Sequence, residues 1–297
     1  MKKNISLSDG TALAVGLAGN PSNPVVMLPV FKQSVYGKDA DNLRMWGVDP
    51  ELGKHMVEGL SDRFRILYFD YEGHLMGNPR PELLTPDSVC QDFLQIADEM
   101  NVPVFSYYGY SWLALAGLQL AIRSNRLESL IMGGFPPLEG PYKEMLTVTS
   151  RTHEQALQQQ NRSGDVFQSS NGPESSPEGF DWGSVQIALD PKQTKQFYTL
   201  YDHLRDFDDK SILELLKLPR LAFAGERDTI VYGENFGGVT VDIAGALRRH
   251  EAALTEQGWD IALLQGEDMD HTKAMQPDTV LPMIKPWLTK HLLAQGK

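Results

Sequence analysis

The chain has 297 residues, a length that fits one large α/β domain with an insertion or two small domains. Hydrophobic residues make up 41% of it, which is enough to form a packed core. The formal net charge of −12 argues against a nucleic acid or an anionic membrane as a partner, because both attract a basic protein face.

The N-terminus and the cysteine content bear on where the protein works. Met1-Lys2-Lys3 is charged like the start of a signal peptide, but residues 5–10 supply no apolar segment after it. No stretch approaches the ~18 apolar residues that a transmembrane helix needs. The single cysteine, Cys90, cannot form an internal disulfide and falls in a predicted helix, where we expect a structural thiol. These features predict a cytoplasmic protein that does not bind membranes.

In the first half of the chain, strand patterns alternate with helix patterns. The turn signal Asp9-Gly10 separates two apolar segments and predicts a hairpin. Long polar or turn-rich connections are expected at 32–50 and 70–81. Strands are predicted at 25–28, 65–69, 104–108 and 127–132, and helices at 51–60, 86–100 and 112–123. This alternation predicts an α/β fold with a mostly parallel, doubly wound sheet and helices on both faces.

The alternation stops between residues 138 and 216, which we interpret as a helical cap inserted into a core domain of residues 1–137 and 217–297. Within the insertion, residues 161–179 are crowded with Ser, Gly, Pro and Asn, which predicts a flexible loop. Helices are expected at 190–206 and 210–216. After it, strands are predicted at 220–225 and 260–264, with a helix at 241–257 and a closing helix that Pro282 and Pro286 interrupt.

Residues 104–117 carry the clearest chemical signal. Strand-like residues end at Gly109, Ser111 follows two residues later, and a helix-forming run begins at Trp112. Such a strand–turn–helix, a nucleophile elbow, lifts a serine hydroxyl clear of the sheet, where a histidine can reach it. The backbone N–H of Trp112 would then point at a developing oxyanion. Leu113 stands where the pattern G-x-S-x-G has its last glycine, and this suggests a looser or differently angled turn.

An aspartate and a histidine follow later strands. Asp228 comes after the strand at 220–225, and His271 comes after the strand at 260–264. The carboxyl ends of parallel strands share one edge of a sheet, so residues far apart in the sequence can converge there. The chain order of Ser111, Asp228 and His271 is that of an α/β-hydrolase catalytic triad.

On these residues the chain resembles the α/β-hydrolase fold superfamily, in its esterase, lipase and aminopeptidase-like branch, over about residues 5–293. The matching motifs are Gly109-Tyr110-Ser111-Trp112, Asp70-Tyr71-Glu72-Gly73-His74, Gly225-Glu226-Arg227-Asp228 and Asp270-His271. The resemblance implies that Ser111 is the nucleophile, His271 the general base and Asp228 the residue that orients the imidazole. It also implies an oxyanion hole formed by the backbone N–H groups of Trp112 and Phe31, although Pro29-Val30 replaces the usual His-Gly.

The resemblance implies a serine hydrolase that works by acyl transfer on a small molecule, most simply a carboxylic ester, without a cofactor or metal. An aminopeptidase, a thioesterase, a C–C hydrolase or a perhydrolase would use the same triad. A hydrolase-like ligand-binding protein with little turnover is the alternative from another class. The oligomeric state stays open.

Further candidates lie around the expected triad. Tyr36, Tyr110 and Trp182 are candidates for lining the pocket, although Tyr36 would equally fit a solvated loop and Trp182 a small core within the insertion. A second source for the triad acid is the run of aspartates at positions 206, 208 and 209, which ranks behind Asp228.

Overall fold

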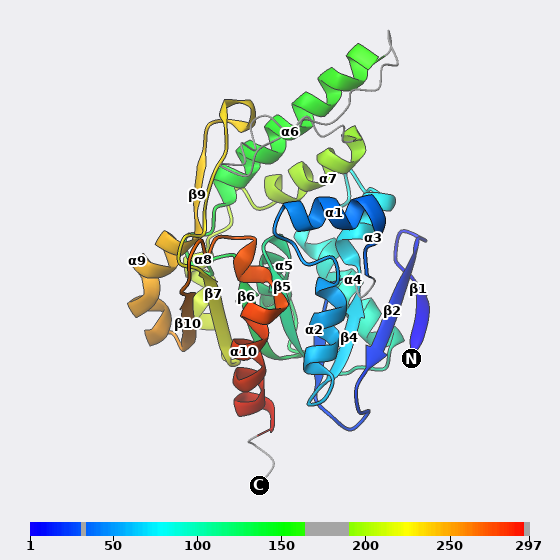
Figure 1. Ribbon diagram of the computed structural model, residues 1–297, viewed down its shortest axis with the longest axis vertical. Coiled ribbons are helices and arrows are strands. Elements are labelled where there is room, and N and C mark those ends of the chain that lie inside the picture. The colour runs from blue at the N-terminus through cyan, green and yellow to red at the C-terminus, as the bar shows by residue number, and fades with distance from the viewer. Residues whose placement is uncertain (31–33, 164–189, 294–297) are drawn as a thin grey trace.

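The computed structural model describes residues 1–30, 34–163 and 190–293. At its centre is an eight-stranded sheet with the strand order β1-β2-β4-β3-β5-β6-β7-β10 (Figure 1). The pairs β1–β2 and β2–β4 are antiparallel, and all other neighbours in the sheet are parallel. The strands are β1 (Lys2–Ser6), β2 (Ala12–Ala18), β3 (Val25–Leu28), β4 (Arg65–Phe69), β5 (Phe105–Tyr110), β6 (Leu127–Gly133), β7 (Arg220–Gly225) and β10 (Trp259–Leu264). The expectation of a mostly parallel sheet is confirmed.

Helices cover both faces of this sheet and enclose two separate cores. One core joins the sheet to α4 (Pro86–Glu99), α5 (Trp112–Arg123) and α9 (Ile243–Glu256). The other joins it to α2 (Leu52–Leu60) and α10 (Pro277–Leu288). Successive residues of a strand point to opposite faces, which is why Tyr107 lies in the first core and Tyr108 in the second. The sheet is therefore doubly wound, as predicted.

Three segments differ from the sequence-based expectation. The polar connection contains α1 (Gly37–Met45), and the turn-rich loop after β4 contains α3 (Tyr71–Gly77). Helix α10 continues through Pro282 and Pro286 and ends in a π-helical turn at Thr289–Leu293. The buried side chains of Val280, Ile284 and Leu288 pack in the second core, and we attribute the persistence of the helix to this packing.

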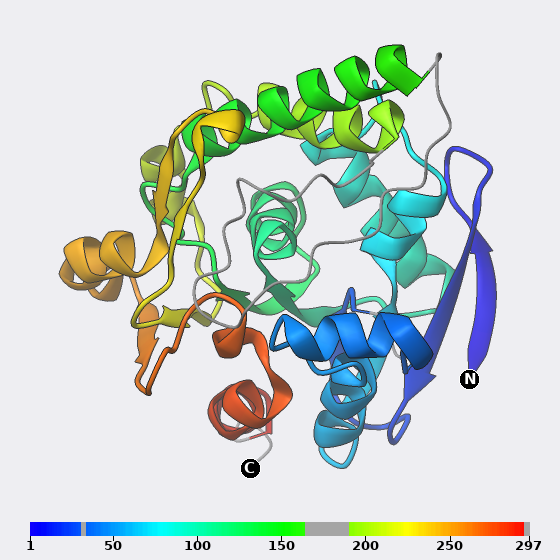
Figure 2. The same ribbon diagram turned by 45° about the horizontal axis from the view of Figure 1, so that its top comes forward.

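The inserted segment between β6 and β7 is helical. It contains α6 (Tyr142–Ser163), α7 (Pro191–Asp202), α8 (Asp209–Ile212) and the short 3₁₀ helix η2 (Leu213–Leu215). Helices α6 and α7 pack side by side on one side of the sheet domain (Figures 1 and 2). The predicted flexible loop lies mostly outside the described residues, because the described part of the insertion stops at 163 and resumes at 190.

A second, two-stranded sheet was not foreseen from the sequence. Its strands are β8 (Thr229–Val231) and β9 (Thr240–Asp242), joined across the 3₁₀ helix η3 (Glu234–Phe236). The hairpin extends to α6, where the Gln155 side chain donates a hydrogen bond to the Asn235 carbonyl. Of the helices that the structure describes, none is both long enough and apolar enough to cross a membrane.

Candidate active site

Ser111 occupies a strained turn between β5 and α5. Its φ of 55° lies in the left-handed region, which non-glycine residues rarely adopt and which often marks a functional site. The Ser111 N–H donates to the Gly133 carbonyl at the end of β6, with an N–O distance of 2.8 Å. The Ser111 side chain is half-buried and makes no capping hydrogen bond to α5. This turn presents the hydroxyl at the carboxyl end of β5.

Two other glycines supply the close packing that Leu113 was expected to prevent. A Cβ atom on Gly109 would lie 2.3 Å from the Leu113 carbonyl oxygen, and one on Gly117 would lie 2.4 Å from the Tyr107 ring. The Tyr107 hydroxyl also donates to the Leu113 carbonyl at 2.7 Å. Helix α5 therefore packs tightly against β5, which argues against the looser of the two turns that the sequence allows.

Asp228 and His271 meet at the same edge of the sheet. Asp228 follows β7 and is completely buried, whereas the His271 side chain, after β10, is 20% exposed. The His271 Nδ1 atom lies 3.0 Å from each carboxylate oxygen of Asp228. An ionised carboxylate can only accept hydrogen bonds, so Nδ1 is the donor. The Nε2 atom of a neutral His271 is then left with a lone pair that can accept a proton.

The turn at Gly133 and Gly134 brings Ser111 and His271 to one corner of the molecule. Gly133 accepts the Ser111 N–H, while a Cβ atom on Gly134 would lie only 2.7 Å from His271 Cε1. Gly134 has a φ of +62°, so both conformation and space favour glycine here. Tyr110 completes the corner, because its hydroxyl donates to the His271 carbonyl at 2.7 Å and its ring lies 5.0 Å from the imidazole.

The remaining predicted site residues fall in different places. Trp112 is the first residue of α5, where a helix has N–H groups without intrahelical partners. Tyr36, the residue before α1, is 80% exposed. Phe31 and Trp182 lie outside the described residues.

Two of the three aspartates considered as a second source for the acid are engaged elsewhere. Asp209 accepts a hydrogen bond from the Gly140 N–H at 2.8 Å, and Asp208 caps α8 through the Ser211 N–H. Cys90 is buried in α4, and burial raises the pKa of its thiol to about 12, which suits a structural residue. Among the described residues, no group of His, Cys, Asp and Glu is arranged to hold a metal ion.

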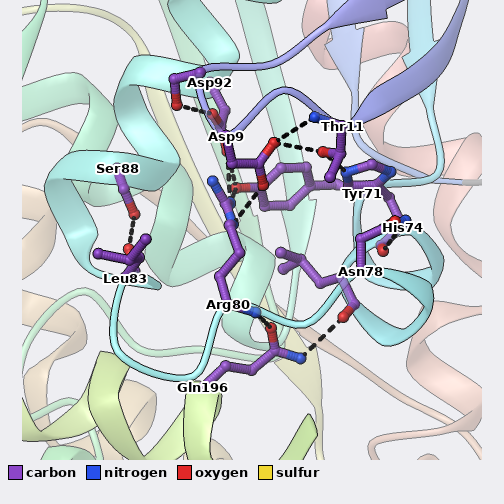
Figure 3. Close-up of polar contacts among 12 residues, drawn as sticks. Asp9, Thr11, Tyr71, His74, Asn78, Arg80, Leu83, Ser88, Asp92 and Gln196 are labelled. Atoms are coloured by element: carbon purple, nitrogen blue, oxygen red, sulfur yellow. Dashed lines mark hydrogen bonds and ion pairs between the residues drawn. The ribbon is translucent and has the colours of Figure 1, made fainter. Parts of the chain in front are cut away.

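A buried polar network that sequence analysis missed lies behind α3 (Figure 3). The Arg80 Nη2 atom donates to Asp92 Oδ2 at 2.6 Å and to the Tyr71 hydroxyl at 2.7 Å, and Tyr71 donates to Asp92 at 2.6 Å. The Arg80 backbone N–H donates to the Gln196 side chain on α7, which in turn donates to the Leu75 carbonyl on α3. The network therefore ties α7 to the loop after β4.

Glu72 was also missed, and it contacts the residue that follows Ser111. The Trp112 Nε1 atom donates to Glu72 Oε2 at 2.7 Å. The Trp112 ring meets Phe197 of α7 edge-on at 5.4 Å and lies 6.2 Å from the ring of Tyr71. Glu72 is exposed as a residue, but the protein around its carboxyl end excludes water and raises the pKa of that carboxyl, against the opposite influence of the Trp112 hydrogen bond. No local spacing signals this contact, because 40 residues separate the partners.

Comparison with known proteins gives full-length structural likenesses and one short sequence match. No protein-family model matches the chain. RutD of Agrobacterium fabrum, a proposed carbamate hydrolase, is 34% identical over 74 residues, which amount to 24% of this chain and 28% of that protein. The chain is thus matched over much less than the full length of that relative.

The structural likenesses extend over nearly complete chains. A hydrolase from Pseudomonas aeruginosa PA01 has a TM-score of 0.59 at 18% identity and covers 98% of both chains. A structure from a study of carboxylesterases of Nitrososphaera gargenis has a TM-score of 0.61 at 14% identity, covering 98% of this chain and 100% of that one. At such low identity these likenesses bear on the fold alone. Together with the strand order, they show that this chain has the fold of the α/β-hydrolase superfamily.

Proposed function

We propose that this protein is a serine hydrolase that cleaves a small carboxylic ester by acyl transfer. The observation that carries the proposal is the pair of hydrogen bonds between His271 Nδ1 and the buried carboxylate of Asp228. The strained turn at Ser111 supports it, because that turn shares the Gly133-Gly134 corner with His271. The likeness to structures named as a hydrolase and a carboxylesterase agrees with this reaction class.

In the proposed mechanism, Ser111 Oγ attacks the ester carbonyl carbon while His271 Nε2 takes the hydroxyl proton. Asp228 stabilises the resulting imidazolium, and the N–H of Trp112 donates to the oxyanion of the tetrahedral intermediate. The imidazolium then protonates the departing alcohol, which leaves Ser111 acylated. Water attacks the acyl group with His271 again as the base, and the acid and the free serine are released.

The insertion and the location belong to the same proposal. Residues 138–216 would act as a cap over the carboxyl edge of the sheet, on a core of residues 1–137 and 217–297. The edge-on contact between Phe197 of α7 and Trp112 supports this arrangement. The single buried cysteine supports a reducing, cytoplasmic location.

The same triad would also serve an aminopeptidase, a thioesterase, a C–C hydrolase, a perhydrolase or a carbamate hydrolase like the one that RutD is proposed to be. An ester is placed first because its alcohol departs more readily than the amine of a peptide bond or the carbanion of a C–C bond. A ligand-binding protein with little turnover is the contrasting hypothesis, and a test of serine reactivity separates the two.

The test is labelling with a neutral fluorophosphonate, read by intact mass. We expect one adduct on the wild type and on Ser61→Ala, a control serine at the end of α2, and none on Ser111→Ala. The wild type and Ser61→Ala should hydrolyse short-chain 4-nitrophenyl esters, and Ser111→Ala should not. A folded wild type that takes up no label would overturn the proposal and favour the ligand-binding hypothesis.

A further inference from the structure

The Glu72 side chain has features of a recognition group beside the proposed nucleophile. Glu72 is exposed as a residue, but its carboxyl end lies against Trp112 and is partly withdrawn from water. One of the carboxylate oxygens, Oε2, receives the Trp112 indole N–H at 2.7 Å. Oε1 makes no hydrogen bond and the carboxylate makes no ion pair within the described part of the chain. Trp112 directly follows Ser111, so this open acceptor lies one side chain away from the turn that presents the hydroxyl.

A purely structural role for Glu72 is already filled by its neighbour. Glutamate in the first turn of a helix commonly stabilises the N-terminal end of the helix dipole. At α3, however, Asp70 caps this end by accepting the Gly73 N–H at 2.8 Å. The Glu72 carboxylate turns instead toward α5, where it meets the indole of Trp112.

The buried network holds the backbone of Glu72 in place through its chain neighbour. Its neighbour Tyr71 is completely buried and bonded to both Arg80 and Asp92 (Figure 3). A recognition group is most effective when surrounding residues hold its backbone in place, since little conformational freedom is then lost on binding. The carboxylate is thus held by a rigid segment, although Glu72 itself is accessible.

The surroundings of this carboxylate suit a cation. The Trp112 ring, whose indole nitrogen is bonded to this carboxylate, meets Phe197 edge-on, and the faces of aromatic rings attract positive charge. Since no described residue neutralises Glu72 with an ion pair, a positively charged group of a ligand would supply the missing partner. An anionic group would be repelled by the same carboxylate.

We propose that Glu72, together with the Trp112 ring, selects substrates that carry an ammonium group close to the ester bond. The inference rests on the proposed hydrolase function and specifies its substrate class. Glu72 binds and positions the substrate, and it takes no part in the proton transfers between Ser111 and His271.

The test compares esters of equal shape that differ in charge. Choline butyrate is paired with 3,3-dimethylbutyl butyrate, in which a carbon replaces the nitrogen of the alcohol part. For the acyl part, 4-nitrophenyl 4-(trimethylammonio)butanoate is paired with 4-nitrophenyl 5,5-dimethylhexanoate. The quantity measured is the selectivity, the kcat/KM of the cationic ester divided by that of its neutral partner. It is measured for the wild type, Glu72→Gln and Glu99→Gln.

Glu72→Gln keeps the size of the side chain and an oxygen acceptor for Trp112 but removes the charge. We expect the wild type to prefer the cationic ester of at least one pair, and Glu72→Gln to lower that selectivity about tenfold or more. Glu99→Gln makes the same change of net charge at an exposed site on α4, paired only with Lys3, and should leave the selectivity within about twofold. Equal selectivity of Glu72→Gln and the wild type in both pairs, or a neutral preference of the wild type in both, would overturn the inference.

A binding experiment separates this inference from the proposed hydrolysis. In the Ser111→Ala background, calorimetry compares choline with 3,3-dimethylbutanol, its neutral counterpart. Choline binding that is lost on adding Glu72→Gln supports the cation site even if the wild type hydrolyses nothing. If the wild type is labelled at its serine but the two alcohols bind equally, the proposed hydrolase function stands and the proposed cation site is overturned.

Discussion

The hydroxyl of Tyr110 donates a hydrogen bond to the carbonyl of His271 at 2.7 Å, which ties the last residue of β5 to the loop after β10. Ser111 follows Tyr110 directly, so this bond joins the chain neighbour of the proposed nucleophile to the proposed general base. The Tyr110 ring also lies 5.0 Å from the imidazole and crosses it at 51°. The position of His271 is therefore set by β5 as well as by its own loop.

Replacing Tyr110 with phenylalanine removes this bond while keeping the ring. The His271 carbonyl loses a partner, and the free energy of unfolding should fall by about 1 kcal/mol. Because the histidine loop loosens, we expect kcat/KM for a neutral ester to fall about tenfold, with the loss mainly in kcat. Steady-state kinetics and urea denaturation measure the two effects. Tyr232→Phe is the control, because among the described residues the Tyr232 hydroxyl makes a weak contact with the Met145 sulfur. Equal activity of the two variants would contradict the prediction.

Asp228→Asn tests the orientation of the imidazole. The amide keeps the shape of the side chain, but it cannot stabilise the imidazolium, and its NH₂ group can turn toward Nδ1 and favour the other tautomer. We expect kcat to fall about 10⁴-fold, as in serine hydrolases of this mechanism, while the far-ultraviolet circular dichroism stays unchanged. A loss smaller than about tenfold in a folded variant would mean that Asp228 does not serve as the triad acid.

The sequence allowed the sheet to be predicted because its signals are local. Apolar runs mark the buried strands, and glycine with serine between a strand and a helix marks the turn at Ser111. The meeting of Asp228 and His271 could be expected from topology, since both follow parallel strands and such ends share an edge. Helix α3 was hidden because Gly73 and Gly77 imitate a loop, although Asp70 supplies a recognisable cap.

The contacts that surround the site could not be predicted from the sequence. Glu72 and Trp112 stand 40 residues apart, and the Gln196 bond to Arg80 spans 116. Polar pairs at such separations leave no periodic pattern, because their meeting depends on how α3, α5 and α7 pack. In the sequence, each of these residues stands alone as a polar or aromatic residue, and nothing nearby indicates its partner.

Asp92 lies at the centre of the buried network, and removing its charge should destabilise the fold. It is completely buried, and Arg80, which it contacts, is only 6% exposed. Asp92→Asn removes the nearer carboxylate from a buried guanidinium and leaves only the longer ion pair with Asp9, at 3.6 Å, so we expect the free energy of unfolding to fall by about 3 kcal/mol. The matched control is Asp87→Asn on the same helix, whose ion pair with Arg123 is exposed and should contribute at most about 1 kcal/mol. Urea denaturation measures the loss of unfolding free energy in both variants. Similar losses would show that the buried ion pair stabilises the fold no more than the exposed one.

The pH dependence of stability gives an independent test of the surroundings of Glu72. Although Glu72 is exposed as a residue, the protein around its carboxyl end excludes water and raises its pKa above the ordinary value of 4.5, and the nearby Asp70 carboxylate acts in the same direction. A raised carboxyl pKa means that the folded state binds the proton more tightly than the unfolded state, so ionisation of Glu72 disfavours folding. The destabilisation is absent well below pH 4.5, grows as the pH rises through the folded-state pKa, and is constant above it.

Glu72→Gln has no charge to lose, so it should melt at a higher temperature than the wild type at pH 7–8. As the pH falls toward 4, the difference between the two melting temperatures should shrink and vanish. Glu99→Gln, which alters an exposed pair with Lys3, should show no such pH-dependent gain. Thermal melts of the three proteins at unit intervals from pH 4 to 8 measure the effect. If Glu72→Gln is less stable than the wild type by the same amount at pH 7 and at pH 4, the Glu72 side chain stabilises the fold. That result would contradict the prediction that ionisation of Glu72 destabilises the folded state.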